Sequence, residues 1–322
     1  MTGPGRIALV VNPVATRASR GLRAETERVL SPLGLEWVLV TAGPGDAARL
    51  AAQAAAEGAA VVVTLGGDGT VADVAGVLAG GPVALAPLPA GNANVFARAV
   101  GWPRRARIAV PLLVEALAGG TVREAALGRL VIDGRERIFA INAGVGLDAA
   151  TVEWIEARPR TKRRLRQAGF ALATGIAAVR ARGAARLAVG VDGIAQTEAL
   201  AVLVACGTPY TYLGSRPLDL VPGAAFDGHL AWVALTRAWP HEIGGLLLRA
   251  IRGRDLPVGG PALSGGAVAR ELVVRSGDPA PVQADGEPLG RHHEVRIAPG
   301  PVLRVVTPVT APALKTEGAR TI

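Results

Sequence analysis

The sequence is poor in cysteine, lysine and aromatic residues. Cys206 is the single cysteine, so no disulfide can form within the chain and a reducing compartment is expected. Because Cys206 stands in an apolar run, we expect it to be a small buried side chain. The chain has only 5 Trp, 2 Tyr and 4 Phe, none of them interleaved with its basic run. This scarcity disfavours a surface that stacks RNA bases, and no nucleic-acid partner is expected.

Long apolar runs are also missing. No uncharged apolar stretch approaches the roughly 18 residues that a membrane-spanning helix needs, and no leader precedes the first strand-like run, so neither a span nor a secretory signal is expected. The chain is nevertheless 50% hydrophobic and 19% charged, as is typical of a globular protein, and we expect it in the cytoplasm. Its formal net charge of +9 can attract an anionic membrane or phosphorylated ligands.

A glycine turn interrupts the apolar stretch at residues 59–78. A β-branched run to Leu65 predicts a buried strand, and helical spacing of apolar residues resumes at Val71. Between them lies Gly66-Gly67-Asp68-Gly69-Thr70, which lets a backbone approach a ligand at a helix N-terminus that favours phosphate. Asp68 would repel phosphate unless a cation intervenes or the carboxylate acts on a proton, which implies magnesium. Alone, such a turn is more often a plain connection between a strand and a helix.

Alternating strand and helix patterns surround this turn and predict a parallel α/β sheet, Rossmann-like, covered on both faces. The 322 residues predict two domains, residues 1–121 and 122–307, with a loose tail at 308–322. After residue 122 the pattern changes to successive strand-like runs, which indicate a mainly antiparallel β-sandwich. The expected strands are at 125–132, 137–143, 187–191, 199–205, 230–235, 271–274, 295–297 and 303–307. Two helices interrupt these runs, one over Lys162–Arg182 and one over His241–Arg252. The expected elements of the first domain are strands at 7–11, 36–41, 59–65 and 83–86 and helices at 22–33, 46–57, 71–78, from about 95, and 111–117. Asp46 is expected to be the N-cap of the second of these helices.

Four further phrases stand in order along the chain. Asn12-Pro13 ends the first strand, Pro87–Arg98 reads PLPAGNANVFAR, Gly146–Ala149 reads GLDA, and Val282–Leu289 reads VQADGEPL. Together with GGDGT they resemble the diacylglycerol kinase catalytic family, while NAD kinases share GGDGT but are not expected to carry the DGE phrase. Two positions depart from the family pattern, because Asn92 replaces a threonine and Val95 replaces an aspartate.

The resemblance implies a lipid kinase of the NAD kinase and diacylglycerol kinase fold type, with ATP and Mg²⁺ in a cleft between the domains. It implies Glu287 as the general base and Asp68 as the residue that orients or binds the metal. It also matches Asp227 to an element that holds a structural magnesium in relatives, although only this acid is clearly present. The expected nucleotide-binding residues are Asn12, Gly66, Gly67, Gly69, Thr70, Gly91 and Asn94.

A lipid acceptor implies contact with a membrane surface, at the inner face of the membrane for a cytoplasmic protein. The basic cluster at Arg158–Arg166 is the candidate for this peripheral docking, with a solvated charged face as the alternative. A sphingoid base or a non-lipid alcohol stays open as the acceptor, and a homodimer stays open as the assembly. Asn92 and Val95 leave open a third function, a nucleotide-binding regulator without turnover. His292 and His293 are interpreted as solvated turn residues.

Overall fold

A computed structural model of the chain describes residues 5–156 and 186–311. These residues divide into two compact units, one made of residues 5–127, 225–228 and 301–311 and the other of the described residues in 128–224 and 229–300. The expected helix at Lys162–Arg182 and the basic cluster at Arg158–Arg166 lie outside the described residues, as does the tail beyond residue 311. Among the helices that are described, none has the length and apolar character that crossing a bilayer requires.

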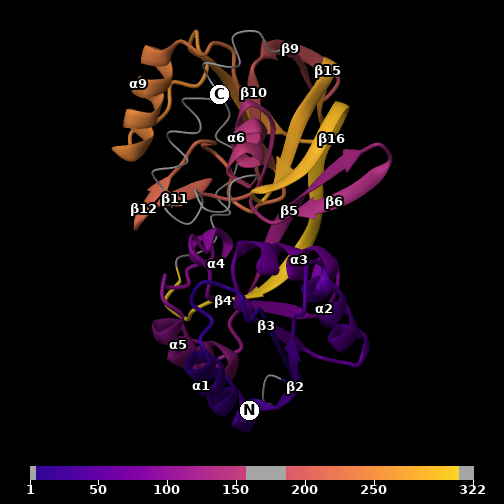
Figure 1. The fold of residues 1–322 in the computed structure, drawn as a ribbon, viewed down its shortest axis with the longest axis vertical. Helices are drawn as coiled ribbons and strands as arrows, with labels where there is room; N and C mark the ends of the chain where they lie inside the picture. The colour runs from indigo at the N-terminus through magenta and orange to yellow at the C-terminus, as the bar shows by residue number, and fades with distance from the viewer. Residues whose placement is uncertain (1–4, 157–185, 312–322) are drawn as a thin grey trace. The chain divides into compact units, whose positions relative to one another are not determined.

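The first unit is a parallel sheet with helices on both faces, as the alternating pattern predicted. The strands lie in the order β2-β1-β3-β4, and the end of β16 adds a further parallel strand through the pair Val305 and Leu85. Figure 1 shows α1 and α5 on one face and α2 and α3 on the other. The elements are β1 Ile7–Val11, α1 Arg20–Leu30, β2 Leu35–Val40, α2 Asp46–Ala56, β3 Val61–Gly66, α3 Asp68–Leu78, β4 Ala84–Pro89, α4 Val95–Ala99 and α5 Ala106–Ala118.

The central strands of this unit bring the loops that follow them to one edge of the sheet. Every residue of β1, β3 and β4 is buried, whereas β2 alternates between half-buried and exposed residues as an edge strand does. The register pairs Val11 with Leu65 and Gly66 with Pro89. The carboxyl ends of β1, β3 and β4 therefore lie at one edge of the sheet, where open α/β folds bind ligands.

Two predictions at helix starts in the first unit were wrong. The helix expected after Pro111 begins five residues earlier, so Pro111 lies inside α5. Proline removes one backbone hydrogen bond there, but Ala109, Val110 and Leu113 are buried, and their packing outweighs that loss. Asp46 does not cap α2 but is its first residue, and its carboxylate accepts the N–H of Ala42 at 2.8 Å.

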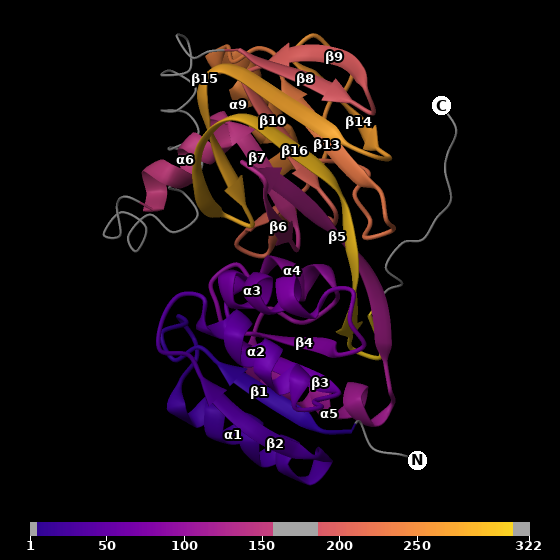
Figure 2. The ribbon, with the colours of Figure 1, turned by 90° about the vertical axis from the view of Figure 1, so that its right-hand side faces the viewer.

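The second unit is rich in antiparallel strands, as predicted. Strands pair in the order β14-β13-β10-β7-β15-β16, while β8 and β9 form a hairpin beside β15. Figure 2 shows these strands with α6 and α9 beside them. The elements are β5 Val122–Ile132, β6 Arg135–Phe139, β7 Asn142–Gly146, α6 Leu147–Glu156, β8 Leu187–Val191, β9 Ile194–Ala199, β10 Ala201–Ala205, β11 Thr211–Leu213, β12 Arg216–Leu218, β13 Leu230–Leu235, α9 Pro240–Ile251, β14 Leu263–Val268, β15 Leu272–Ala284 and β16 Glu287–Val306.

Several element boundaries in this unit differ from the prediction. The single strand expected at 137–143 is two strands, β6 and β7, because the backbone between them turns its N–H groups to a distant carboxylate. The separate strands expected at 295–297 and 303–307 are one long strand, β16. Helix α6 and strand β14 were not predicted, and β14 contains Gly265 and Gly266, which weaken a strand pattern. The helix predicted at His241–Arg252 is confirmed as α9.

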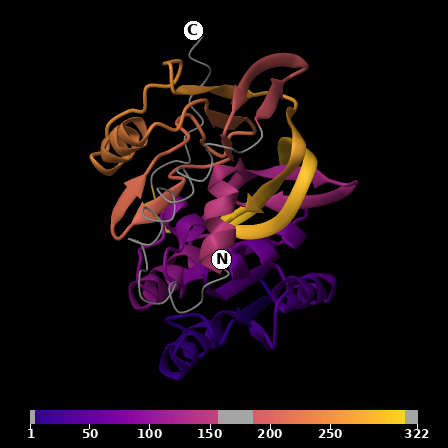
Figure 3. The ribbon, with the colours of Figure 1, turned by 45° about the horizontal axis from the view of Figure 1, so that its top comes forward.

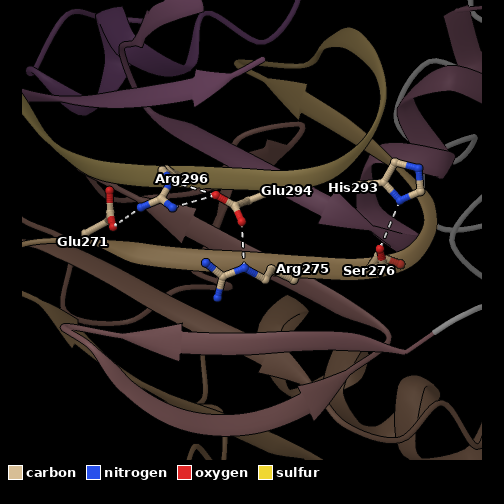
Figure 4. A network of polar contacts seen from close by, with 6 residues as sticks. All are labelled: Glu271, Arg275, Ser276, His293, Glu294 and Arg296. Atoms are coloured by element: carbon tan, nitrogen blue, oxygen red, sulfur yellow. Dashed lines mark hydrogen bonds and ion pairs between the residues drawn. The ribbon is translucent and has the colours of Figure 1, made fainter. Parts of the chain in front are cut away.

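Charged side chains link β15 and β16 on an exposed face (Figure 4). Arg275 Nε donates to Glu294 at 2.7 Å, and Arg296 contacts both Glu294 at 2.8 Å and Glu271 at 3.0 Å. Exposed ion pairs of this kind contribute roughly 0–1 kcal/mol each, so they support the strand register more than the fold. His293 Nδ1 lies 3.2 Å from the carbonyl oxygen of Ser276. The sequence suggested that His292 and His293 are turn residues. This prediction was wrong, because both lie within β16.

Candidate functional site

The glycine turn of the first unit is shorter than its motif. Gly66 is the last residue of β3, Gly67 precedes the helix, and Asp68 already begins α3. A Cβ added at Gly66 would lie 2.6 Å from Thr70, and one added at Gly91 would lie 2.5 Å from the Cα of Gly67. The backbones at Gly67 and Gly91 therefore pass so closely that Gly91 admits no side chain, and a Cβ at Gly67 would be tight, 3.3 Å from the Cα of Gly91. Gly69 in the first turn of α3 is exposed, and the N–H groups at this helix start are suited to an anion.

Asn12 joins the first loop to this turn. Its side-chain amide donates to the Thr70 hydroxyl at 3.0 Å, and its backbone N–H donates to the carbonyl of Leu65 at 3.0 Å. The side-chain oxygen also accepts the N–H of Val14 at 3.1 Å. Thr70 is buried, so Asn12 fixes the orientation of its hydroxyl. The structure thus brings together two residues that the sequence predicted for one site.

Asp68 connects the glycine turn to the start of α4. Its carboxylate accepts the backbone N–H of Asn94 at 2.8 Å and that of Val95. Burial raises the pKa of Asp68, while these N–H bonds act in the opposite direction. The carboxylate therefore caps α4 in addition to any part it takes in binding. Val95, which replaces an acid of the family pattern, contributes its backbone to this contact.

The loop at Gly91 is closed by Asn94 and by a residue that the sequence did not reveal. Asn94 is buried with φ of 51°, and its side chain accepts the N–H of Gly91 at 2.8 Å and donates to the Gly91 carbonyl at 3.1 Å. Asn94 thus shapes the turn from within. Arg17 Nη1 also donates to the Gly91 carbonyl, at 2.9 Å. The sequence could have indicated Arg17 only through its position shortly after Asn12-Pro13, because an isolated arginine in a loop belongs to no motif.

The DGE phrase of the second unit forms a tight hairpin turn. Ala284 pairs with Glu287, and the two residues between them have positive φ, 50° at Asp285 and 80° at Gly286, as in a type I′ turn. The Asp285 carboxylate accepts three backbone N–H groups, from Ala140 at 2.6 Å, Ile141 at 2.8 Å and Asn142 at 3.1 Å. Burial nevertheless raises the pKa of Asp285 to about 6. Asp285 is therefore the anchor of the turn.

Glu287 differs from Asp285 in its surroundings. Its side chain is 56% exposed and forms an ion pair with Arg137 on β6. Of the two acids in this turn only Glu287 is exposed, because Asp285 turns inward to the backbone at 140–142. Glu287 is thus the acid of this turn that is open to solvent, and its ion pair with Arg137 restrains its orientation.

A buried polar network lies behind the turn. Asp148 Oδ2 accepts the Tyr210 hydroxyl at 2.9 Å and the Gln283 amide at 2.8 Å, and Gln283 Oε1 accepts the N–H of Gly286 at 2.9 Å. A Cβ at Gly144 would overlap Asp148 Oδ2, so this position requires glycine. Burial raises the pKa of Asp148. Asp148 was noticed in the sequence, whereas Tyr210 and Gln283 belong to no motif and were missed.

The residues present fit a magnesium ion that arrives with a nucleotide. Mg²⁺ usually binds one or two carboxylates and completes its shell with phosphate oxygens and water, so Asp68 at the glycine turn can suffice. A structural magnesium at Asp227 has less support. Asp227 is exposed, and over residues 5–156 and 186–311 no group of three or more His, Cys, Asp or Glu side chains is placed to hold a metal.

Comparison with known proteins agrees with these features. The diacylglycerol kinase catalytic domain matches residues 6–130. A "probable lipid kinase YegS-like" of Pseudomonas aeruginosa is 32% identical over 292 residues, 86% of each chain. A diacylglycerol kinase of Mycobacterium tuberculosis is 33% identical over 153 residues, 45% of this chain and 47% of the relative, so the match spans about half of that protein. A diacylglycerol kinase structure from Bacillus anthracis shares the fold, with a TM-score of 0.69 and 17% identity over 95% of this chain and 98% of that one.

The chain belongs to the diacylglycerol kinase family of lipid kinases. The Pseudomonas aeruginosa relative establishes this membership, because the similarity runs along nearly all of both chains. The predicted family and fold class are thereby confirmed.

Proposed function

We propose that this chain is an ATP-dependent lipid kinase, which transfers the γ-phosphoryl group of ATP to the hydroxyl of diacylglycerol or a related lipid. The observation that carries the proposal is the close approach of Gly67 and Gly91, where an added Cβ would lie 2.5 Å from backbone. A Cβ at Gly69, in the first turn of α3, would meet nothing within 4 Å, so there is open space beside this turn. Polyphosphate is the ligand that such a backbone surface favours.

On the nucleotide side, the roles follow from the contacts of the first unit. The N–H groups at Asp68, Gly69 and Thr70 would bind phosphate oxygens, since the first residues of a helix have no carbonyl partners within it. Asn12 holds the Thr70 hydroxyl, and Asn94 holds the Gly91 loop. Asp68 is the residue that would hold Mg²⁺, which supplies charge neutralisation on the phosphates when bound. These residues position the reacting group, which is most of what phosphoryl transfer requires.

On the acceptor side, Glu287 would act as the general base. It takes the proton of the acceptor hydroxyl as that oxygen forms a bond to the γ-phosphorus, and the bond from phosphorus to the ADP oxygen breaks. Its exposure allows a hydroxyl to reach it, and Arg137 orients it. Asp285 is less suited to the role because its carboxylate already accepts three N–H groups. Asp285 and Gln283 fix the turn that presents Glu287.

The substrate class also suggests where the protein works. A lipid acceptor lies in a bilayer, so we place the protein in the cytoplasm with peripheral contact to the membrane surface. The product would be a phosphorylated lipid, and its use in phospholipid biosynthesis is part of the proposal.

The proposal is tested by incubating the chain with magnesium, γ-labelled ATP and a mixed lipid extract. We expect label in one lipid class, which chromatography then identifies as phosphatidic acid or a related phospholipid. Label in a sphingoid base or in a water-soluble alcohol would replace diacylglycerol as the acceptor. Binding of ATP without label in any fraction would contradict the kinase assignment and favour a regulator without turnover.

A further inference from the structure

Helix α9 has one face packed into the second unit and one face turned to solvent. Ile243 and Leu246 pack against the hydrophobic core of the unit, and Ala250 is buried. Their spacing of three and four residues defines the inner face. The outer face carries His241, Gly244, Gly245, Leu248, Arg249 and, directly after the helix, Arg252, all exposed. Figure 3 shows α9 at the periphery of its unit, next to β12.

Two large apolar side chains protrude at this helix. Trp239, directly before α9, is 56% exposed, and Leu248 on the outer face is 45% exposed. All five tryptophans lie in the described residues, and Trp239 is the one that is exposed. An exposed indole costs solvation free energy unless a partner covers its apolar ring while the N–H stays near water. The interface of a lipid bilayer meets both conditions.

Four arginines stand close to these two residues in the sequence. Arg237, Arg249, Arg252 and Arg254 are exposed, and within residues 5–156 and 186–311 none of them forms an ion pair with a carboxylate. Arg249 Nε donates to the backbone carbonyl of Asp255 at 2.9 Å. The acids between residues 237 and 255 are Glu242, which has a buried carboxylate oxygen, and the exposed Asp255. Residues 237–255 therefore carry four arginines against two acids, and Arg249 and Arg252 lie on the outer face.

We propose that Trp239, Leu248 and the four arginines form a docking surface for an anionic lipid bilayer. This inference rests on the proposed function, because a kinase needs to reach a bilayer only if its acceptor is a lipid. Arginines bind lipid phosphates while Trp239 and Leu248 enter the headgroup region, which is how amphipathic helices lie on membranes. A protein partner could also use Trp and Arg side chains, which are common at protein interfaces, so the experiment below separates a bilayer from a second copy of the chain.

Vesicle flotation without ATP tests the docking surface. The native chain is mixed with vesicles of equal parts phosphatidylcholine and phosphatidylglycerol at low salt, and with vesicles of phosphatidylcholine alone. We expect binding to the anionic vesicles that weakens as salt is added. The double variant Arg249→Glu, Arg252→Glu should bind roughly thirtyfold or more weakly, since each cation near such a surface contributes about fivefold.

The matched control is the double variant Arg104→Glu, Arg107→Glu. These arginines are also exposed and lie at the start of α5, beside the exposed Ile108, so the change in net charge is the same. We expect this variant to bind vesicles nearly as well as the native chain. Trp239→Ala should weaken binding at low salt and abolish the part that persists at high salt. Urea unfolding of each variant confirms that the exposed substitutions leave the fold intact.

Three results would overturn the proposal. Equal loss of binding in both double variants would mean attraction by net charge alone, and equal binding of native chain and the α9 variant would mean that α9 is not involved. A native chain that dimerises through this face, becomes monomeric in the α9 variant and binds no vesicles would assign the face to a second copy. The docking surface and the proposed function can fail separately. Vesicle binding is measured without phosphate transfer, and transfer to a short-chain, water-soluble diacylglycerol tests the kinase activity without docking.

Discussion

Two aspartates in different units perform the same structural task. Asp68 accepts backbone N–H groups of Asn94 and Val95, and Asp285 accepts three from residues 140–142. Each carboxylate thus holds a remote loop against the turn that carries its own motif. Hydrogen bonds to a charged acceptor are stronger than neutral ones, and a buried N–H without a partner is costly. An aspartate in these motifs is therefore required for architecture as well as for any part in chemistry.

Removing the carboxylate of Asp68 should destabilise the first unit. Asp68→Ala leaves the N–H groups of Asn94 and Val95 without their acceptor, which should lower the free energy of unfolding by about 1–3 kcal/mol. Asp68→Asn retains one acceptor oxygen and should lose less. Urea titration measures both, with Asp278→Ala on the exposed surface of β15 as the control. A loss no larger than that of the control would show that Asp68 does not anchor α4.

Asp285 should make stability fall as pH rises through a defined window. Its folded pKa is raised from 3.8 to about 6 by burial, so the folded chain keeps a proton that the unfolded chain has released. The stabilising contribution is full below about pH 4 and is lost by about pH 6, amounting to about 3 kcal/mol. Urea titration across this window compares the native chain with Asp285→Asn, in which that dependence should disappear. Parallel pH profiles for the two proteins would contradict the raised pKa.

The residues of the site were only partly accessible from sequence. Asn12, Thr70, Gly91 and Asn94 were predicted from motifs and lie together at one edge of the sheet. The orientation of Asp68 could not be predicted, because it depends on a loop 26 residues away that supplies the N–H donors. The Arg17 contact crosses 74 residues and leaves no local pattern.

At the scale of the elements, a substitution in the glycine turn that begins α3 should weaken ATP binding without lowering stability. A Cβ at Gly69 meets nothing within 4 Å, so Gly69→Ala should leave stability unchanged or raise it by up to about 1 kcal/mol. The added methyl group would occupy the space where phosphate approaches, and ATP affinity should fall roughly tenfold, about 1.4 kcal/mol. Calorimetric titration with ATP and magnesium measures this change.

The matched control is Gly21→Ala in α1. Gly21 is the second residue of its helix, as Gly69 is of α3, and a Cβ there also meets nothing within 4 Å. We expect Gly21→Ala to leave ATP affinity as it is in the native chain. Unchanged affinity in Gly69→Ala would place the phosphates elsewhere.

Elements with local signals were predicted well, and elements that depend on distant contacts were not. Buried runs identified β1, β3 and β13, and apolar spacing identified α9. The break between β6 and β7 was missed because its cause is Asp285, 145 residues further along the chain. Strand β14 was missed because two glycines interrupt its pattern, although its pairing with β13 is regular from Leu230 to Leu235.

For the whole molecule, two independent observations support the proposed lipid kinase activity, namely family membership and the contacts within the site. The relative with similarity along 86% of both chains establishes the family, and the contacts show how this chain builds each motif without its expected threonine and aspartate at Asn92 and Val95. The backbone of Val95 still contacts Asp68. The turn therefore keeps its contacts without those two side chains, and we expect turnover.

The most direct test compares the rate of phosphate transfer from ATP to diacylglycerol for the native chain, Glu287→Gln and Glu136→Gln. Glu136 is the matched control, because it is 53% exposed and pairs with Arg129 much as Glu287 pairs with Arg137. We predict that the native chain and Glu136→Gln form phosphatidic acid at similar rates, while kcat of Glu287→Gln falls by roughly 10²–10⁴. Equal rates for all three proteins would remove Glu287 from the mechanism, and no product from the native chain would contradict the proposed kinase activity.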